Sequence, residues 1–245
     1  MTWYAKPRGS YGINSTEGLA NITEMSSNFS GFTYEARAAI IGNSVHEGGL
    51  NPWRWQYDSE AQIPNGGYGL FQFTPGEDYI MLPDSSPNLS TTHQTPEAQA
   101  DDGIVQCQCV ATDRLHKWVG VCWRPYWNDD GTMQGNPLYP DLYNYRSQIL
   151  SMYGGSGGIT LSQFKLITDV DAATFVFLAC YEGPRIPNYT ARQSTAWDIY
   201  NILMGYDPPI PPTPPVPPTP YPPDPGNVPL WILKKIRDNN FNNML

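Results

Sequence analysis

Positive charge is scarce in this sequence. Its 245 residues include 14 Lys and Arg against 23 Asp and Glu, which gives a formal net charge of -9. A nucleic-acid binder needs a basic surface to neutralise phosphates, and the sequence has no basic run outside a short cluster at 234–237. The charge balance therefore argues against that class of protein, and it also disfavours simple electrostatic adhesion to an anionic surface.

Long apolar runs are missing as well. No stretch of about 18 apolar residues occurs, and the N-terminus has no charged segment followed by an apolar core. We therefore expect a chain that is made in a cytoplasm, is not exported by a signal peptide and does not span a membrane. No fixed-period repeat is present, so a repeat architecture is not expected.

Cysteine is too infrequent for a dense disulfide framework in a chain of this size, so we expect reduced and mostly buried thiols. The four are Cys107, Cys109, Cys122 and Cys180. His116 lies near three of them, but the Cys-x-Cys spacing differs from the usual Cys-x2-Cys of zinc knuckles. We expect no metal and no cofactor.

Proline is abundant, with 25 residues, and it is concentrated in one segment. Repeated prolines at 208–225 fix the backbone and remove hydrogen-bond donors, so this segment is expected to form a polyproline II spacer of about 55 Å. The chain then divides into a main domain at 1–206, a Pro-rich linker at 207–227 and a docking segment at 228–245. The apolar and basic residues of the last are compatible with a short amphipathic helix.

Helical signals dominate the main domain. Thr33 is expected to cap a helix that carries Glu35 in its first turn and ends at Gly48-Gly49. Another is expected to start at Thr95-Pro96-Glu97 and to run to about Trp118, with a weak point at Gly103. Strand-like alternation is scarce, so the predicted fold class is mainly α. Two further helices are expected from Asp171 to Glu182, before Gly183-Pro184, and from Asn188 or Thr190 to Gly205.

Glu47 has the most distinctive setting. It lies at the end of the apolar helix that follows Thr33, and Trp53 and Trp55 come shortly after it. The negative end of a helix dipole and nearby aromatic rings both disfavour a charged carboxylate, so we expect Glu47 to hold its proton above the usual pH range. A protonated glutamate near neutral pH is the general acid that glycoside cleavage requires. Considered alone, Glu47 also fits a solvated residue before a C-cap glycine.

Two motifs around Glu47 resemble those of lysozyme-like enzymes that cleave peptidoglycan. Residues 47–52 read Glu-Gly-Gly-Leu-Asn-Pro, similar to the E-S-G-x-x-P sequence that carries the acid in those families, with Gly48 in place of serine. Residues 67–75 read Gly-Tyr-Gly-Leu-Phe-Gln-Phe-Thr-Pro and resemble the G-x-x-Q-W/F-T segment that lines the sugar groove. An amide can hydrogen-bond a sugar and aromatic faces can pack on it. The expected substrate-binding residues are therefore Tyr68, Gln72, Phe73, Trp53 and Trp55.

A third segment resembles phage tail lysozymes. Phe164, Asp171-Ala172-Ala173, Phe177 and 181–184 resemble the F-x-x-x-x-D-x-x-x-A-A-x-x-F…Y-E-x-P signature of that family. They are also similar to the Y-N-A-G-P segment of lytic transglycosylases, and the wider superfamily includes goose-type lysozymes. The resemblance implies a lysozyme-like helical domain with loop-rich insertions, in which Tyr181 faces the cleft near Glu47 and Glu182 is structural. Tyr181 also fits a core tyrosine.

The identity of a second carboxylate is open. Asp58 and Glu60 lie between the first two motifs, and Asp58 is our candidate, although a surface-loop acid describes both equally well. Without a second acid, Glu47 could act first as acid and then as base, giving either inversion or the anhydro product of a lytic transglycosylase. A zinc protease is excluded because position 50 is leucine, and a cysteine amidase is disfavoured because Cys180 lies in an apolar helix.

Together these features predict a phage tail-associated glycosidase of the muramidase type, carried in the virion and synthesised in the host cytoplasm. Its expected partners are the glycan strands of peptidoglycan and other tail proteins, which would bind residues 228–245. Two alternatives stay open. One is a structural tail protein that keeps the fold but does not cut, and the other is a free endolysin, for which a wall-binding module would be expected after the spacer.

Overall fold

The fold is that of a computed structural model, which describes residues 3–56, 66–80, 96–118, 149–154, 158–184 and 188–205. All of these belong to the first of two units of the chain, Met1–Asp207. Helices dominate the described residues, and the pairings of extended backbone are the isolated bridges Trp55–Tyr68 and Tyr68–Phe73. The prediction of a mainly α, lysozyme-like domain is confirmed. The predicted linker at 207–227 and docking segment at 228–245 lie outside the described residues.

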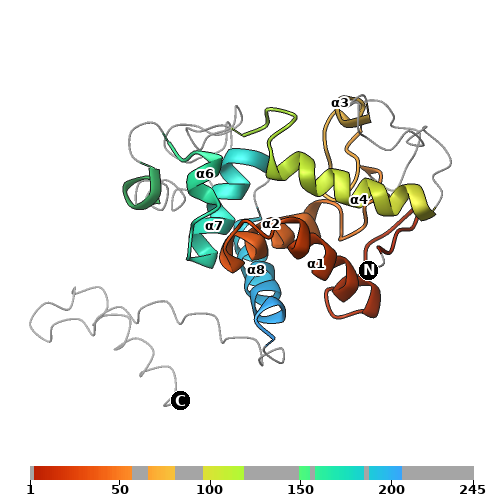
Figure 1. The fold of residues 1–245 in the computed structure, drawn as a ribbon, viewed down its shortest axis with the longest axis horizontal. Coiled ribbons are helices and arrows are strands. Elements are labelled where there is room, and N and C mark those ends of the chain that lie inside the picture. Colours follow the sequence, from red (N-terminus) through yellow and green to blue (C-terminus); the bar gives the residue numbers. More distant parts are fainter. Residues whose placement is uncertain are drawn as a thin grey trace, which may run out of the picture. The chain divides into compact units, whose positions relative to one another are not determined.

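Helix α2 (Tyr34–Glu47) lies between α1, α7 and α8 (Figure 1). As predicted, Thr33 caps it: the Thr33 Oγ1 atom accepts a hydrogen bond from the Ala36 backbone N–H at 3.2 Å. Because neighbours cover it on several sides, α2 is buried well beyond a single apolar stripe. Its buried residues are Ala36, Ala38, Ala39, Ile40, Ile41, Gly42, Asn43 and Ser44.

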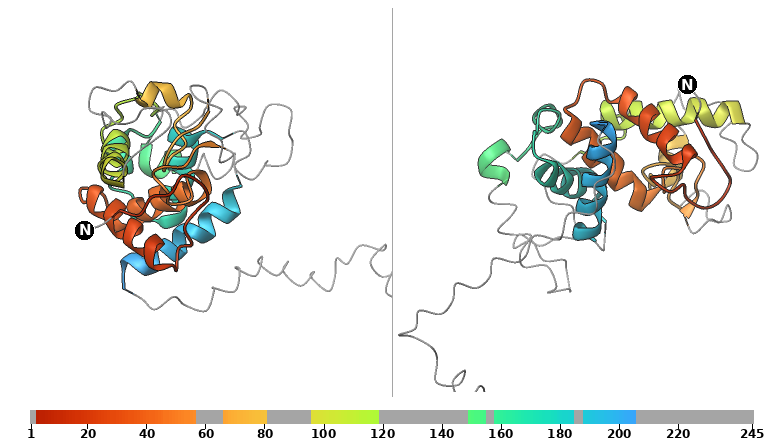
Figure 2. Two further views of the ribbon diagram at one scale, coloured as in Figure 1. Left: turned by 90° about the vertical axis from the view of Figure 1, so that its right-hand side faces the viewer. Right: turned by 90° about the horizontal axis from the view of Figure 1, so that it is seen from below.

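Helix α8 (Tyr189–Leu203) makes the closest approach to α2, and both views of Figure 2 show the two side by side. A Cβ atom added at Gly42 would lie 2.8 Å from the Cα atom of Ala196, so a glycine is needed where the backbones meet. The predicted last helix is confirmed with Asn188 at its N-cap. Asn188 adopts φ 44° and makes no side-chain cap hydrogen bond, and Thr190 lies inside the first turn.

Helix α7 (Val170–Phe177) continues as the π-helical turn η4 (Leu178–Glu182) and ends at Gly183, which has φ 54°. The prediction that Asp171 starts this helix is wrong by two residues. The N-cap is Asp169, whose Oδ1 atom accepts a hydrogen bond from the Ala172 N–H at 2.7 Å. Asp171 lies in the first turn, where its carboxylate accepts a hydrogen bond from the Trp197 indole at 2.7 Å.

Helices α1 (Thr16–Asn28) and α4 (Pro96–Ala111) pack against each other. The sequence did not predict α1. The prediction that α4 runs to about Trp118 is wrong, because the chain turns at Asp113 (φ 50°), whose carboxylate accepts hydrogen bonds from the N–H groups of residues 117 and 118. Gly103 does not interrupt α4; it makes room for the ring of Trp3.

Three short elements complete the described residues: α3 (Gly76–Ile80), η3 (Leu150–Gly154) and α6 (Leu161–Phe164). Each has five residues or fewer, which is too short for a periodic pattern to emerge in the sequence. Among the helices of the described segments, none has the length and hydropathy needed to cross a bilayer.

Candidate active site

Glu47 is the last residue of α2, and the packing around the next position, 48, requires a glycine. The N–H of Gly48 donates to the Ser44 carbonyl at 2.9 Å and to the Leu70 carbonyl at 3.1 Å. A Cβ atom at position 48 would lie 2.3 Å from the carbonyl oxygen of Gly69 and 2.5 Å from the Cα atom of Leu70. No side chain fits there without movement of the backbone, which explains why glycine stands where the related motif has serine.

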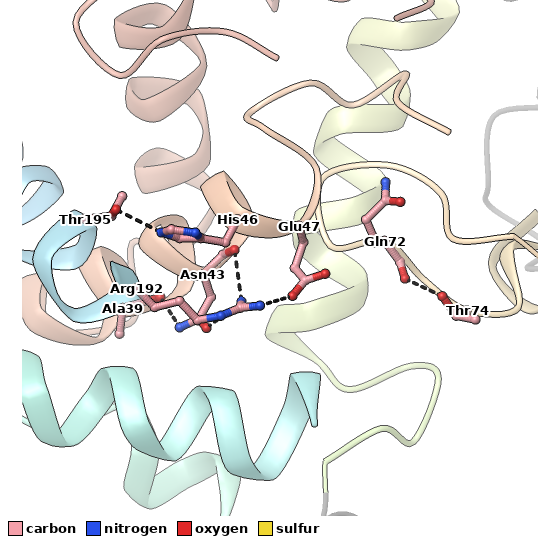
Figure 3. Close-up of polar contacts among 8 residues, drawn as sticks. All are labelled: Ala39, Asn43, His46, Glu47, Gln72, Thr74, Arg192 and Thr195. Atoms are coloured by element: carbon pink, nitrogen blue, oxygen red, sulfur yellow. Dashed lines mark hydrogen bonds and ion pairs between the residues drawn. The ribbon is translucent and has the colours of Figure 1, made fainter. Parts of the chain in front are cut away.

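An arginine holds the Glu47 carboxylate (Figure 3). The Nη2 atom of Arg192, in the first turn of α8, lies 2.5 Å from Oε1 of Glu47, and the side chains of the two residues are 4% and 19% exposed. The Nη1 atom of Arg192 donates to Asn43 on α2, at 3.1 Å to Oδ1 and 3.4 Å to the backbone carbonyl. The guanidinium therefore lies against α2 one helical turn before Glu47.

This ion pair corrects the setting that the sequence suggested for Glu47. We expected a carboxylate without a charged partner, surrounded by aromatic rings, and the structure instead places a guanidinium on it. The retention of a proton by Glu47 stays a prediction. Sequence analysis missed Arg192, 145 residues further along the chain. The sequence gives one local sign that Arg192 has a partner elsewhere. A cation in the first turn of a helix opposes the helix dipole, so an arginine is unfavourable there without a compensating contact.

His46 makes a second link between α2 and α8. Its Nε2 atom lies 3.0 Å from Oγ1 of Thr195, and that hydroxyl donates its own hydrogen to the carbonyl of Ala191 at 2.9 Å. The hydroxyl can therefore only accept from the ring, which assigns the proton to Nε2. Although His46 is an exposed residue, desolvation lowers its pKa below the usual value, and the charge of Arg192 lowers it further.

The Gln72 side chain stabilises the loop that contains it. Its Nε2 atom donates to the carbonyls of Arg54 at 3.1 Å and Gly69 at 3.0 Å, and Gln72 itself adopts φ 44°. Figure 3 shows this amide turned away from Glu47, whereas the Gln72 carbonyl faces the exposed hydroxyl of Thr74, which donates to it at 2.8 Å. Binding of a sugar by Gln72 stays a prediction.

Four aromatic residues that were expected to contact the sugar lie in the core instead. Their exposed fractions are 0% for Tyr68, 1% for Phe73, 2% for Trp55 and 2% for Tyr181. Trp55 packs on Tyr68 with ring centroids 4.3 Å apart, Phe73 stacks on Tyr79 at 4.7 Å, and Tyr181 stacks on Phe177 at 5.0 Å. Rings this deeply buried offer no face to a ligand, so these residues support the site from within. Trp53, the fifth, is half-buried and keeps surface for a contact.

A buried glutamine on α4 joins the two motif segments. The Gln106 side chain is fully buried; its Oε1 atom accepts from the Leu70 N–H at 2.6 Å, and its Nε2 atom donates to the Pro52 carbonyl at 2.8 Å. It therefore connects the residues that follow Glu47 with the Gln72 loop. Sequence analysis missed Gln106, because nothing local distinguishes it from its exposed neighbour Gln108.

The remaining candidates lie elsewhere. Asp58 and Glu60 fall outside the described residues, so a second carboxylate stays a prediction. Within the described parts of the chain, no group of three or more His, Cys, Asp or Glu residues is placed to hold a metal ion. Cys107 and Cys109 are buried, and burial raises the pKa of the Cys109 thiol to about 11, which keeps it protonated.

The described residues form a mainly α domain that is consistent with a lysozyme-like fold, and its buried helix α2 ends in a partly exposed carboxylate. Residues 19–119 match the family model for phage tail lysozyme. The matched segment makes up about two-fifths of the chain and is similar to that family. The match ends before α7 and α8, so Arg192 lies outside it. No curated protein matches the chain.

Proposed function

We propose that the protein is a tail-associated glycosidase that cleaves the glycan strands of the host cell wall as infection begins, with Glu47 as the general acid. The observation that carries this proposal is the setting of the Glu47 carboxylate. Oε1 is held by Arg192, whereas Oε2 accepts no hydrogen bond from any residue that the structure describes. The Glu47 side chain is 19% exposed, so we infer that Oε2 is the oxygen that meets a substrate.

In this mechanism, protonated Glu47 gives its proton to the glycosidic oxygen while the bond between that oxygen and the anomeric carbon breaks. The bonding electrons leave with the oxygen, which takes up the proton, and the sugar develops oxocarbenium character. Glu47 becomes an anion as the proton leaves, and the Arg192 guanidinium stabilises that anion. The oxygen of a water molecule, or of the substrate's own hydroxyl in a transglycosylase, then bonds to the anomeric carbon and gives up its proton to a carboxylate, either the candidate Asp58 or the Glu47 anion.

Placement in the virion is supported by the family, whose description names the phage tail. The net charge of -9 gives the protein no electrostatic affinity for an anionic cell wall, so delivery by a particle suits it. Residues 228–245 are the proposed contact with other tail proteins. Mass spectrometry of purified particles tests this placement; a chain found in the lysate and missing from particles would indicate a free endolysin.

The second candidate is a structural tail protein that has the fold and no activity. The Arg192–Glu47 pair is the observation in its favour, because in the unliganded protein it already occupies one oxygen of the carboxylate. The two functions differ in one measurement, the loss of turbidity of purified peptidoglycan.

The test compares wild type, Glu47→Gln and Glu35→Gln. Glutamine keeps the size of Glu47 and cannot donate an acidic proton, so we expect loss of activity by at least about a hundredfold. Glu35 lies at the other end of α2, where its carboxylate accepts from the Tyr200 hydroxyl at 3.3 Å, and its variant should retain activity. Equal rates for wild type and Glu47→Gln would end the enzymatic proposal. Reducing ends or anhydro ends in the products distinguish hydrolysis from transglycosylation.

A further inference from the structure

We propose that Arg192 is a positioning residue for the acid. It fixes Oε1 of Glu47, so that Oε2 is the oxygen that transfers the proton, and its charge stabilises the anion that Glu47 becomes. This inference rests on the proposed function, in which Glu47 is the general acid.

The geometry gives Arg192 one orientation. Its side chain is 4% exposed, and its two terminal nitrogens have different partners on α2: Nη1 meets Asn43 and Nη2 meets Glu47. Asn43 is itself fully buried and fixed, because its Nδ2 atom donates to the Ala39 carbonyl at 2.9 Å. Residues 43 and 47 lie one turn apart on the same face of α2, so the guanidinium plane is tied to the helix that carries the acid.

Helix stability does not explain an arginine at this position. A cation in the first turn of α8 opposes that helix's dipole, and removal of a guanidinium from water has a cost that an ion pair at best balances. The compensation comes from the carboxylate of Glu47 and the oxygens of Asn43. The benefit is therefore found at the site, where the pair directs one carboxylate oxygen and stabilises the anion left after proton transfer.

Other charges on the surrounding elements do not replace this contact. Within the described part of the molecule, Arg192 is the cation that pairs with Glu47. The neighbouring His46 has a lowered pKa, so it adds no full charge near neutral pH. The charged or titratable groups on the described elements around this end of α2 include His46, Arg192, Asp198, Glu182, Asp171, Cys180, Tyr181, Tyr189, Arg54 and Asp78.

The charge of Arg192 can be tested by the pH dependence of lysis. A general acid works while it is protonated, so activity falls as the pH rises through its titration. A cation in contact favours the ionised form, so its removal should move this alkaline limb to higher pH. For Arg192→Gln we therefore expect an alkaline limb at higher pH than that of wild type.

The control for charge is Arg37→Gln. This substitution makes the same change in net charge as Arg192→Gln. Arg37 lies on α2 ten residues before Glu47, about 15 Å from it along the helix axis. Arg37 donates to the carbonyls of Phe32 and Ser30 and touches no part of the site. Its alkaline limb should coincide with that of wild type. The role of the Arg192 charge is overturned if the alkaline limb of Arg192→Gln coincides with that of wild type. It is also overturned if the limb moves equally in Arg192→Gln and Arg37→Gln.

Arg192→Lys tests the orientation separately and preserves the buried charge if the glutamine variant does not fold. Lysine cannot reach Asn43 and Glu47 with two fixed nitrogens, so we expect a rate on the order of tenfold lower with the alkaline limb in place. A wild-type rate in a folded Arg192→Lys protein overturns the orienting role. If Glu47→Gln is as active as wild type, the proposed function itself fails; if only the Arg192 effects are missing, this inference alone fails.

Discussion

The backbone N–H of Gly48 donates to the carbonyl oxygen of Leu70 at 3.1 Å, directly after the carboxylate-bearing residue of α2. This bond joins the end of α2 to the loop that contains Gln72. It forms only because position 48 has no side chain, since a Cβ atom there would lie within 2.6 Å of three backbone atoms of residues 69 and 70. The loop and the acid are therefore positioned by backbone contact.

Gly48→Ser, which restores the residue of the related motif, should destabilise the domain. The added Cβ atom meets backbone, which cannot move aside as a flexible side chain can, so we expect a loss of about 1 to 3 kcal/mol in the free energy of unfolding. Chemical denaturation measures this loss. Gly31→Ala is the control, because a Cβ atom at Gly31 meets no atom within 4 Å. A Gly48→Ser protein as stable as wild type would show that the close approach is not as described.

Gln106→Leu should also destabilise the domain. Leucine leaves the Leu70 N–H and the Pro52 carbonyl without the partners that Gln106 now provides, at a cost on the order of 3 kcal/mol. The matched control is Gln108→Leu, which makes the same substitution at an exposed position on the same helix. Denaturation midpoints of the two variants should differ clearly, and similar midpoints would count against the bridging role of Gln106.

His46 should make the stability of the domain depend on pH. Its pKa is lowered in the folded protein, so below the ordinary histidine value of about 6.5 the unfolded chain binds a proton that the folded chain resists. The contribution of His46 to the free energy of unfolding is therefore complete above that value, and it decreases as the pH falls toward the lowered pKa of the folded protein. Melting temperatures across this range should fall less steeply for His46→Gln than for wild type.

His116→Gln provides the comparison for that experiment, because it removes a histidine outside the α2–α8 contact. It should melt with the pH dependence of wild type. If His46→Gln and wild type show the same pH dependence, the linkage between His46 and α8 is refuted.

Cys109 should be unreactive in the folded protein. Its pKa of about 11 leaves almost no thiolate at mildly alkaline pH, and the residue is 0% exposed. Treatment with iodoacetamide followed by peptide mass spectrometry should find Cys109 unmodified in the native protein and alkylated after denaturation. Rapid native labelling would show that the thiol is accessible.

Local signals in the sequence located the helices whose ends carry them. α2 and α8 were predicted closely, because Thr33, Gly48, Asn188 and Gly205 mark their limits. α1 was missed because it is polar even on its buried face, which includes Asn21, Glu24 and Ser26. The end of α4 was missed because the turn there depends on Asp113 in a left-handed conformation, for which the sequence has no glycine signal.

The site was less predictable than the helices. A short motif singled out Glu47, and its catalytic role is still a proposal. Arg192 could not be found in that way, because its contact with Glu47 depends on how α8 packs on α2. The aromatic residues of the motif could not be divided into sugar-binding and core residues, because both uses favour the same side chains; the burial of Tyr68 and Phe73 decides it.

The α2–α8 contact also sets a lower limit on the length of a stable domain. A fragment trimmed to residues 19–119 would contain the acid but lose the guanidinium, and it would uncover the apolar sides of Ile40 and Ile41. Such a fragment should aggregate before it could be assayed. A shortened version that keeps the Arg192–Glu47 pair must therefore extend through residue 203, the end of α8.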